Sequence, residues 1–399
     1  MSVSAPVILL PAALHRFVEL VLGDPALQAR LGAVLEADAF VAEASAVAAE
    51  HGVPLDAEVL AGSLRPDPLG MGRFGPAPIE LGAWPPQGWL PTRSVPTGGA
   101  PAFDWLWFGD RPLSRSFYED EVRQASALPL NWLLRIRTGM DALLAGAGRE
   151  PELSLTGLIY HMSRCGSTLL GRMLGAVPEN EVTSEPEPLD AVLLWTWREQ
   201  VPIAEAVPGV RAMVAALSRQ RGTGAERLFI KTDAWHTLSL PLLRAAFPDT
   251  PWVYLFRDPT EVLVSHQRMA GMQTVAGVMP EALFGIARGN ELPPLEYAAR
   301  ALDAIGRGVL GHWDLGGGRA VDYPDVAAAA TGRIAAHFGL DLSAAQCDAM
   351  RAAAGFDAKN PDRRFVDDRA AKLAEADPTV AKAARFLAET HTRLLDRAG

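Results

Sequence analysis

The chain has only two cysteines among its 399 residues, Cys165 and Cys347. Two cysteines are too few for a disulfide framework, which favours a reducing compartment and predicts a cytoplasmic protein. No uninterrupted run of about 18 apolar residues occurs, so we expect neither a membrane span nor a membrane partner. The first residues lack a basic leader and their apolar stretch is broken by Pro11, which argues against a secretory signal.

Positive charge is also scarce. The sequence contains 37 Lys and Arg against 47 Asp and Glu, a formal net charge of −10. Proteins that bind nucleic acid neutralise its phosphates with Lys and Arg, so we expect no nucleic-acid partner. Hydrophobic residues make up 49% of the chain and can fill a large core. At roughly 150 residues per domain, the length predicts two or three domains.

The most informative segment runs from Leu155 to Leu174 and reads LTGLIYHMSRCGSTLLGRML. It predicts an apolar strand, a tight polar turn and a helix. A helix that begins directly after a strand has unpaired N–H groups and a partial positive charge, which favour an anion. Arg164 supplies a planar cation, Gly166 allows close approach of the backbone, and Ser167 and Thr168 supply hydroxyls. An ordinary connection capped by a serine is the alternative.

The turn lacks the lysine of ATP-binding loops, which follow the pattern G-x-x-x-x-G-K-[ST]. The stretch 163–170 instead resembles the 5′-phosphosulfate-binding loop of the sulfotransferase family, in which a basic residue, a small residue, glycine and two hydroxyl residues precede a leucine-rich helix. The resemblance implies that 3′-phosphoadenosine 5′-phosphosulfate is bound as co-substrate by Arg164, Cys165, Gly166, Ser167 and Thr168. We expect Cys165 to fill space rather than act as a nucleophile, because sulfuryl transfer needs no covalent enzyme intermediate.

A second segment strengthens the resemblance. The apolar run 252–256 is followed by Arg257, Asp258 and Pro259 and then by a helical stretch. Asp258 is well placed as the helix N-cap and Pro259 as its first residue. Arg257 and Ser265, eight residues later, resemble the 3′-phosphate-binding element of the same family, which implies that both bind the donor. Pairing of Arg257 with a surface carboxylate, with Ser265 in solvent, is the alternative.

A third segment lies between these two. The apolar strand 228–230 ends in Lys231 and Thr232. Sulfotransferases often have a Lys-Thr pair at this strand end, with the lysine directed at the bridging oxygen of the donor. The resemblance therefore gives Lys231 a catalytic role, and a solvent-exposed lysine is the alternative.

The reaction also requires charge neutralisation on the leaving phosphate and a general base for the acceptor's proton. We expect Arg164 and Lys231 to serve the first need. Glu185 is the first candidate for the base, because family members that act on protein tyrosine use a glutamate after the second strand. Asp233 is the second candidate and His236 the third. Each of the three could instead pair with an arginine of the site and take no part in proton transfer.

Composition divides the chain into three regions. Residues 1–62 are expected to form a helical leader-like module, residues 63–150 a Trp- and Pro-rich linking region with helices, and residues 151–399 a sulfotransferase-like α/β domain. The first region contains, in order, Phe-Val-Glu at 17–19, Asp-Pro-Ala-Leu-Gln at 24–28 and His-Gly-Val-Pro-Leu-Asp at 51–56 before Glu-Val-Leu at 58–60. This order resembles the helical module associated with nitrogen-fixation clusters and natural-product leader peptides, which implies peptide docking; a helical hairpin packed on the catalytic domain is the alternative. The second predicts short β structure, a helix begun by a capping box of Ser116 and Glu119, and a helix from Trp132 to Leu144.

The third region alternates strands and helices, with strands expected near 155–161, 180–183, 227–232, 252–256 and 318–322. This alternation predicts a P-loop NTPase-like, three-layer α/β core with a mostly parallel sheet, preceded by a small all-helical module. Right-handed crossovers place the turns that follow the strands at one edge of the sheet. The side chains expected to converge there are Arg164, Glu185, Lys231, Asp233 and Arg257.

These observations predict a sulfotransferase that acts by in-line displacement, without a metal, on a hydroxyl or amine of a small-molecule or peptide acceptor. One alternative is an ATP- or GTP-dependent phosphotransferase in which Asp233 or Asp258 holds Mg²⁺. Another is a noncatalytic protein that binds a nucleotide or peptide. Arg363 and Arg364 lie in a late basic cluster that departs from the family's Arg-Lys-Gly loop, so a donor contact and a solvated charge run both stay open. A homodimer also stays open.

Overall fold

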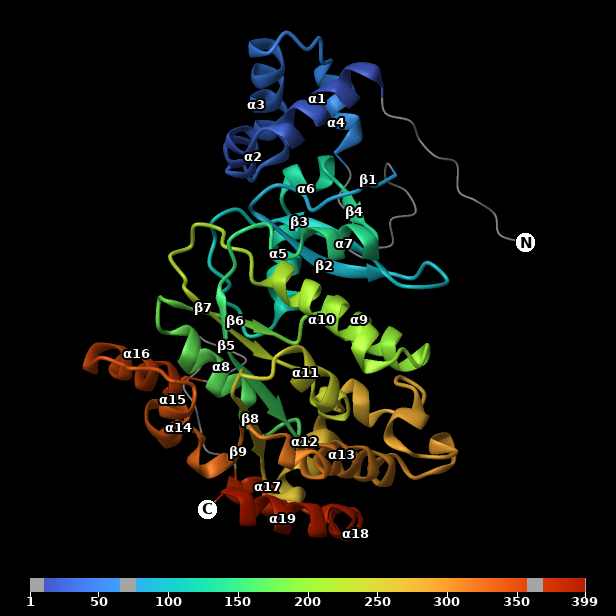
Figure 1. The fold of residues 1–399 in the computed structure, drawn as a ribbon, viewed down its shortest axis with the longest axis vertical. Helices are drawn as coiled ribbons and strands as arrows, with labels where there is room; N and C mark the ends of the chain where they lie inside the picture. The colour runs from blue at the N-terminus through green and yellow to red at the C-terminus, as the bar shows by residue number, and fades with distance from the viewer. Residues whose placement is uncertain (1–10, 65–76, 357–368, 399) are drawn as a thin grey trace. The chain divides into compact units, whose positions relative to one another are not determined.

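The computed structural model describes residues 11–64, 77–356 and 369–398 (Figure 1). Contacts divide the chain into two units. The first comprises Met1–Leu153, Glu187–Gln200 and Pro208–Thr223, and the second comprises Ser154–Pro186, Val201–Val207 and Gly224–Gly399. The three-region division by composition stays a prediction.

The first unit begins with four short helices, α1 (Ala12–Gly23), α2 (Pro25–Gly32), α3 (Ala37–Glu50) and α4 (Ala57–Ser63). They confirm the helices expected in this region. The Asp24 carboxylate accepts the backbone N–H of Ala26 at 2.8 Å, and Pro25 takes the first helical position, so Asp24 is the N-cap of α2. Phe17 and Phe40 are fully buried within this helical module.

A four-stranded sheet of order β1-β4-β3-β2 follows in the first unit. Its strands are β1 (Ile79–Leu81), β2 (Trp89–Val95), β3 (Ala102–Trp107) and β4 (Ile136–Thr138). The unit also contains α5 (Tyr118–Ser126), α6 (Pro129–Leu133), α7 (Met140–Gly146) and α9 (Glu187–Arg198), while α10 (Ile203–Leu217) enters it at Pro208. Trp89 and Trp105 are buried, so the tryptophan-rich stretch forms a local core on short β structure, as predicted.

The capping box expected at Ser116 and Glu119 is wrong. Helix α5 begins at Tyr118, its N-cap is Phe117, and no side chain caps it. The Glu121 carboxylate instead accepts backbone N–H groups of the segment just before the helix.

The single helix expected from Trp132 to Leu144 is also wrong, because β4 interrupts it between α6 and α7. Ile136 of β4 is buried, and the Thr138 hydroxyl accepts the Trp105 indole N–H at 2.8 Å. β-branched side chains pack well between neighbouring strands, and that packing outweighs the local helical pattern.

The second unit is built on a five-stranded parallel sheet of order β6-β7-β5-β8-β9. The strands are β5 (Ser154–His161), β6 (Asn180–Ser184), β7 (Arg227–Lys231), β8 (Trp252–Phe256) and β9 (Gly318–Asp322). They confirm the five predicted strands. β6 and β8 are buried along their whole length, as expected for parallel strands covered on both faces.

Helices cover both faces of this sheet (Figure 1). One face carries α8 (Ser167–Gly175), α14 (Val326–Ala329), α15 (Ala335–His337) and α16 (Ala344–Ala354), and the other carries α11 (Leu240–Ala246), α12 (Pro259–Arg268) and α13 (Pro294–Gly311). The last helices, α17 (Arg369–Glu375), α18 (Pro378–Ala384) and α19 (Ala388–Ala398), pack against α12 and α13. The predicted α/β fold class is confirmed. Among the described helices, none combines the length and apolarity needed to cross a bilayer.

Because all five strands run parallel, their carboxyl ends lie at one edge of the sheet. From the central strand β5, the chain goes first to β6 and β7 on one side and later to β8 and β9 on the other. Ligands of open α/β sheets bind at such a switch point, beyond the carboxyl ends of the strands. The register pairs Lys231 with both Ile159 and Ser184, so Lys231 and Glu185 emerge from neighbouring strands.

Candidate anion-binding and catalytic site

The turn between β5 and α8 has the backbone of an anion-binding loop. Ser163, Arg164 and Gly166 adopt left-handed conformations, with φ of 79°, 54° and 86°. Gly166 is the N-cap of α8, and no side chain caps this helix. Left-handed turn residues beside an uncapped helix N-terminus form a concavity in which N–H groups converge on an anion. The local geometry therefore suits a phosphate or sulfate group.

Gly166 is required by space as well as by its backbone angle. A Cβ at this position would lie 2.7 Å from Cδ2 of Tyr323, which follows β9. The same ring lies under the Arg257 guanidinium, with 3.9 Å between Cζ and the ring centroid. Tyr323 thus joins the loop after β5 to the end of β8. The sequence analysis missed this residue, and its only signal was its position directly after the fifth predicted strand.

Lys231 and Glu185 form an ion pair at the ends of β7 and β6. The lysine side chain is fully buried and the glutamate side chain is 25% exposed. Glu185 has φ of 53°, unusual for a residue with a long side chain, and its N–H donates to the Lys231 carbonyl at 2.7 Å. Burial alone would raise the pKa of Glu185, but the Lys231 charge and the hydrogen bonds from His161 and Lys231 outweigh it and lower that pKa. The Glu185 carboxylate is therefore ionised, and its lowered pKa makes it a weak base while Lys231 is its partner.

His161, the last residue of β5, touches the loop and the ion pair. Its Nδ1 accepts the Ser163 N–H at 3.0 Å, and its Nε2 lies 2.9 Å from the Thr232 carbonyl and 3.4 Å from the Glu185 carboxylate. An amide N–H can only donate, so Nδ1 is unprotonated and Nε2 carries the proton. Burial lowers the pKa of His161, in agreement with a neutral ring. The sequence analysis missed this residue, although a histidine that ends an apolar strand was a signal.

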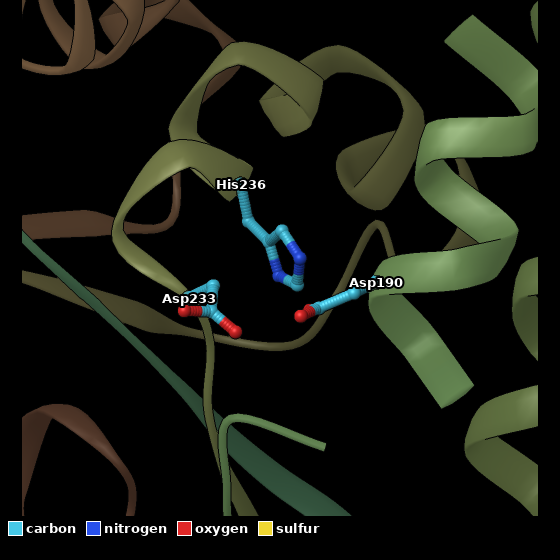
Figure 2. A group of neighbouring side chains, drawn as sticks. All are labelled: Asp190, Asp233 and His236. Carbon is cyan, nitrogen blue, oxygen red and sulfur yellow. The ribbon is translucent and has the colours of Figure 1, made fainter. Parts of the chain in front are cut away.

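Asp233 and His236 extend from the turn after β7, where the 3₁₀ helix η1 (Ala234–Ser239) begins (Figure 2). Their carboxylate and imidazole atoms lie within 4.8 Å of one another. His236 is fully buried, and burial lowers its pKa to about 4 against the opposing charges of Asp233 and Glu185. Both residues therefore lie at the sheet edge that carries Glu185, where the sequence places Asp233.

Arg257 is paired with a carboxylate of α12, the helix that begins two residues after it. Arg257 is buried, and its Nε donates to Glu261 Oε2 in α12 at 2.5 Å. The Ser265 hydroxyl donates to the Glu261 carbonyl at 2.9 Å, and Arg369 Nε lies 3.0 Å from the other carboxylate oxygen. The expectation that Asp258 caps α12 is confirmed. The alternative of a surface partner for Arg257 is wrong, because Glu261 is only 2% exposed.

The remaining loop residues differ in exposure. Arg164 is half-buried, burial lowers its pKa, and its Nη2 donates to the Met269 carbonyl at 2.9 Å. Cys165 is fully buried with its Sγ 3.0 Å from the Leu255 carbonyl oxygen, and burial raises its pKa to about 12. A thiol with that pKa is protonated, which fits the expected space-filling role. Arg363 and Arg364 lie outside the described residues.

Three comparisons with known proteins bear on this site. A family profile described as "Sulfotransferase family" matches residues 158–286, less than half of the chain, and this span includes the anion-binding loop, Glu185, Lys231, Arg257 and Ser265. A search of curated proteins found no match.

Among solved structures, the chain is similar to the sulfotransferase domain from the curacin biosynthetic pathway, with 16% identity over 60% of this chain and 98% of that chain and a TM-score of 0.39. A sulfotransferase from Mycobacterium avium gives 15% identity over 62% of this chain and 77% of that chain, with a TM-score of 0.40.

Proposed function

We propose that the chain is a sulfotransferase that uses 3′-phosphoadenosine 5′-phosphosulfate as its donor. The family match over residues 158–286 supports sulfotransferase activity. One structural observation carries the choice of donor: an uncapped left-handed loop shares a sheet edge with a buried lysine that contacts a carboxylate. That arrangement offers an anion cradle, a cation for a leaving group and a base for an acceptor.

The basic and hydroxyl residues of the site suit an adenosine that carries phosphate groups at its 3′ and 5′ positions. The loop that begins at Arg164 and continues through Cys165, Gly166, Ser167 and Thr168 would hold the 5′-phosphosulfate with backbone N–H groups, hydroxyls and one guanidinium. Arg257 and Ser265 would hold the 3′-phosphate. Arg257 now pairs with Glu261, so donor binding would require its guanidinium to share or exchange that partner.

The chemistry follows from the Lys231–Glu185 contact. In the transfer, a bond forms between sulfur and the acceptor oxygen or nitrogen while the bond from sulfur to the 5′-phosphate oxygen breaks. Lys231 would donate to that departing oxygen, and Glu185 would take the acceptor's proton. When Lys231 turns from the carboxylate to the departing oxygen, the pKa of Glu185 rises towards its ordinary value. The base would therefore become effective only after the donor is bound.

The proposal is tested by titrating the full chain with adenosine 3′,5′-bisphosphate and with ATP, each with Mg²⁺ or EDTA. We expect the bisphosphate to bind at least tenfold more tightly than ATP, with a Kd that Mg²⁺ does not change. Tight ATP binding that requires Mg²⁺ would support a phosphotransferase instead, with Asp233 as a metal ligand. Binding of neither nucleotide would exclude both enzymes and leave a noncatalytic peptide-binding protein.

Gly166→Ala should weaken bisphosphate binding by at least tenfold, because the added Cβ meets the Tyr323 ring and the backbone is left-handed. Gly175→Ala at the other end of α8 is the matched control, since its Cβ would find only an ordinary contact 3.6 Å from Val182 Cγ2. Isothermal titration of both variants measures the effect. Equal Kd values for the two variants would show that the loop does not hold the ligand.

Three finer parts of this function are also proposals. A cytoplasmic location rests on the two cysteines, neither of which forms a disulfide. A hydroxyl or amine acceptor rests on the chemistry of a carboxylate base. Docking of a peptide by α1–α4 rests on the resemblance of the N-terminal module alone.

A further inference from the structure

Two residues of the proposed site have strained backbones, and one side chain contacts both of them. Ser163 and Glu185 belong to the few non-glycine residues with positive φ in the described part of the chain. The His161 ring accepts the Ser163 N–H through Nδ1, and its Nε2 lies 3.4 Å from the Glu185 carboxylate. Strained residues persist only where their surroundings hold them in place. The contacts of His161 therefore lie where such support is needed.

We propose that His161 is a positioning residue that shapes the donor loop through one ring nitrogen and orients the catalytic carboxylate through the other. The inference rests on the proposed function. It assigns His161 no direct part in proton transfer to or from the acceptor. It predicts instead that donor binding and turnover depend on different atoms of the same imidazole.

The first half of this role concerns the donor loop. Ser163 opens the left-handed turn, and a non-glycine residue rarely adopts its φ of 79°. The Nδ1 acceptor, 3.0 Å from the Ser163 nitrogen, fixes the direction of that peptide group. The peptide groups of Arg164 to Gly166 follow directly in the chain. Without the acceptor, we expect the start of the turn, and with it the N–H groups of the anion cradle, to be held less firmly.

The second half concerns the carboxylate. Nε2 donates to the carbonyl of Thr232, which directly follows Lys231, and lies 3.4 Å from the Glu185 carboxylate. Both partners of the Lys231–Glu185 ion pair are thus held relative to β5. A second proton on the ring would remove the acceptor for Ser163 and place another cation beside buried Lys231. The geometry therefore requires a neutral ring with its proton on Nε2.

Two substitutions separate the halves. In His161→Asn, the side-chain amide oxygen can take the place of Nδ1 and accept from Ser163, but nothing reaches Glu185 or Thr232. In His161→Gln, the longer amide can donate where Nε2 does, but the acceptor for Ser163 is lost. His161→Ala removes both functions and is the reference for complete loss. The amide side chains preserve polarity, so the pair differs mainly in which contact it retains.

The experiment measures the Kd of adenosine 3′,5′-bisphosphate and the turnover of saturating phosphosulfate donor, with water or a simple phenol as acceptor. We expect His161→Asn to keep Kd within about threefold and to lose turnover by at least tenfold. We expect His161→Gln to weaken binding by at least tenfold and to retain more turnover at saturation than His161→Asn. Equal changes of Kd and turnover in the two variants would overturn the proposal and indicate a general packing role.

A second measurement does not depend on the reaction. In the wild-type full chain labelled with ¹⁵N in its histidine rings, we expect the His161 signal, assigned by its loss in His161→Asn, to report the Nε2–H tautomer from pH 5.5 to pH 8. A signal that titrates in this range, or an Nδ1–H tautomer, would overturn the proposed contacts. If the tautomer is as expected but wild-type chain binds no bisphosphate, the sulfotransferase proposal fails while the positioning geometry stands.

Discussion

Glu185→Gln should lower the turnover of phosphosulfate donor by about 10²–10⁴-fold, the usual range for loss of a general base. The amide has nearly the same shape but cannot take a proton from the acceptor. The Kd of adenosine 3′,5′-bisphosphate should stay within about threefold of wild type, because the proposed donor-binding residues are unchanged. Turnover is measured as release of the bisphosphate, and affinity by isothermal titration.

The matched control is Glu179→Gln, which makes the same chemical change just before the opposite end of β6, where the side chain accepts from Gln346. It should leave both turnover and affinity unchanged. Near-normal turnover in Glu185→Gln would remove this residue from the base role. Asp233→Asn and His236→Gln would then be the next variants to measure, since both side chains lie at the same sheet edge.

Lys231→Met should lower turnover by at least 10²-fold, comparable to the loss of one preorganised donor to a developing oxyanion. The substitution also removes the partner of Glu185 and leaves a carboxylate beside a fully buried position. Breaking a buried ion pair typically costs about 3–5 kcal/mol. Because the glutamate side chain is 25% exposed, we expect a loss towards the lower end of that range. Thermal and denaturant unfolding measure it.

The double variant Lys231→Met/Glu185→Gln separates stability from catalysis. Removing both charges leaves no uncompensated carboxylate, so the free energy of unfolding should recover part of the loss. Turnover should stay at the level of the worse single variant, because both proposed catalytic groups are absent. Full recovery of turnover in the double variant would contradict the roles given to both residues. Lys382→Met, at an exposed position, is the control for the loss of a lysine.

Three strands of the second unit, β5, β7 and β8, were predictable because each contains a short apolar run that is buried on both faces. The fold class followed from their alternation with helices. Local patterns failed where tertiary packing competed with them. β4 lies inside a stretch with helical spacing, and only its pairing with β1 and β3 makes it a strand.

The positions of the loop residues and of Lys231 at the strand ends were also predictable, since these residues directly follow or end apolar runs in the sequence. The partners of these residues were not. Glu261 follows Arg257 by one helical turn, yet no sequence pattern showed that its carboxylate would be buried against that guanidinium. Tyr323 is more than 150 residues from Gly166 and meets it only because β9 ends near the loop.

The sequence by itself determined the strands and the parallel sheet of the second unit and the cations and hydroxyls at its turns, because hydrophobic runs and turn residues act over a few positions. The tertiary structure alone decided which groups pair: Lys231 with Glu185, His161 with both the loop and the carboxylate, and Tyr323 with Gly166. Pairing depends on strand order and register, which bring distant segments within hydrogen-bond reach. Those contacts set the protonation of the site, and hence its proposed chemistry.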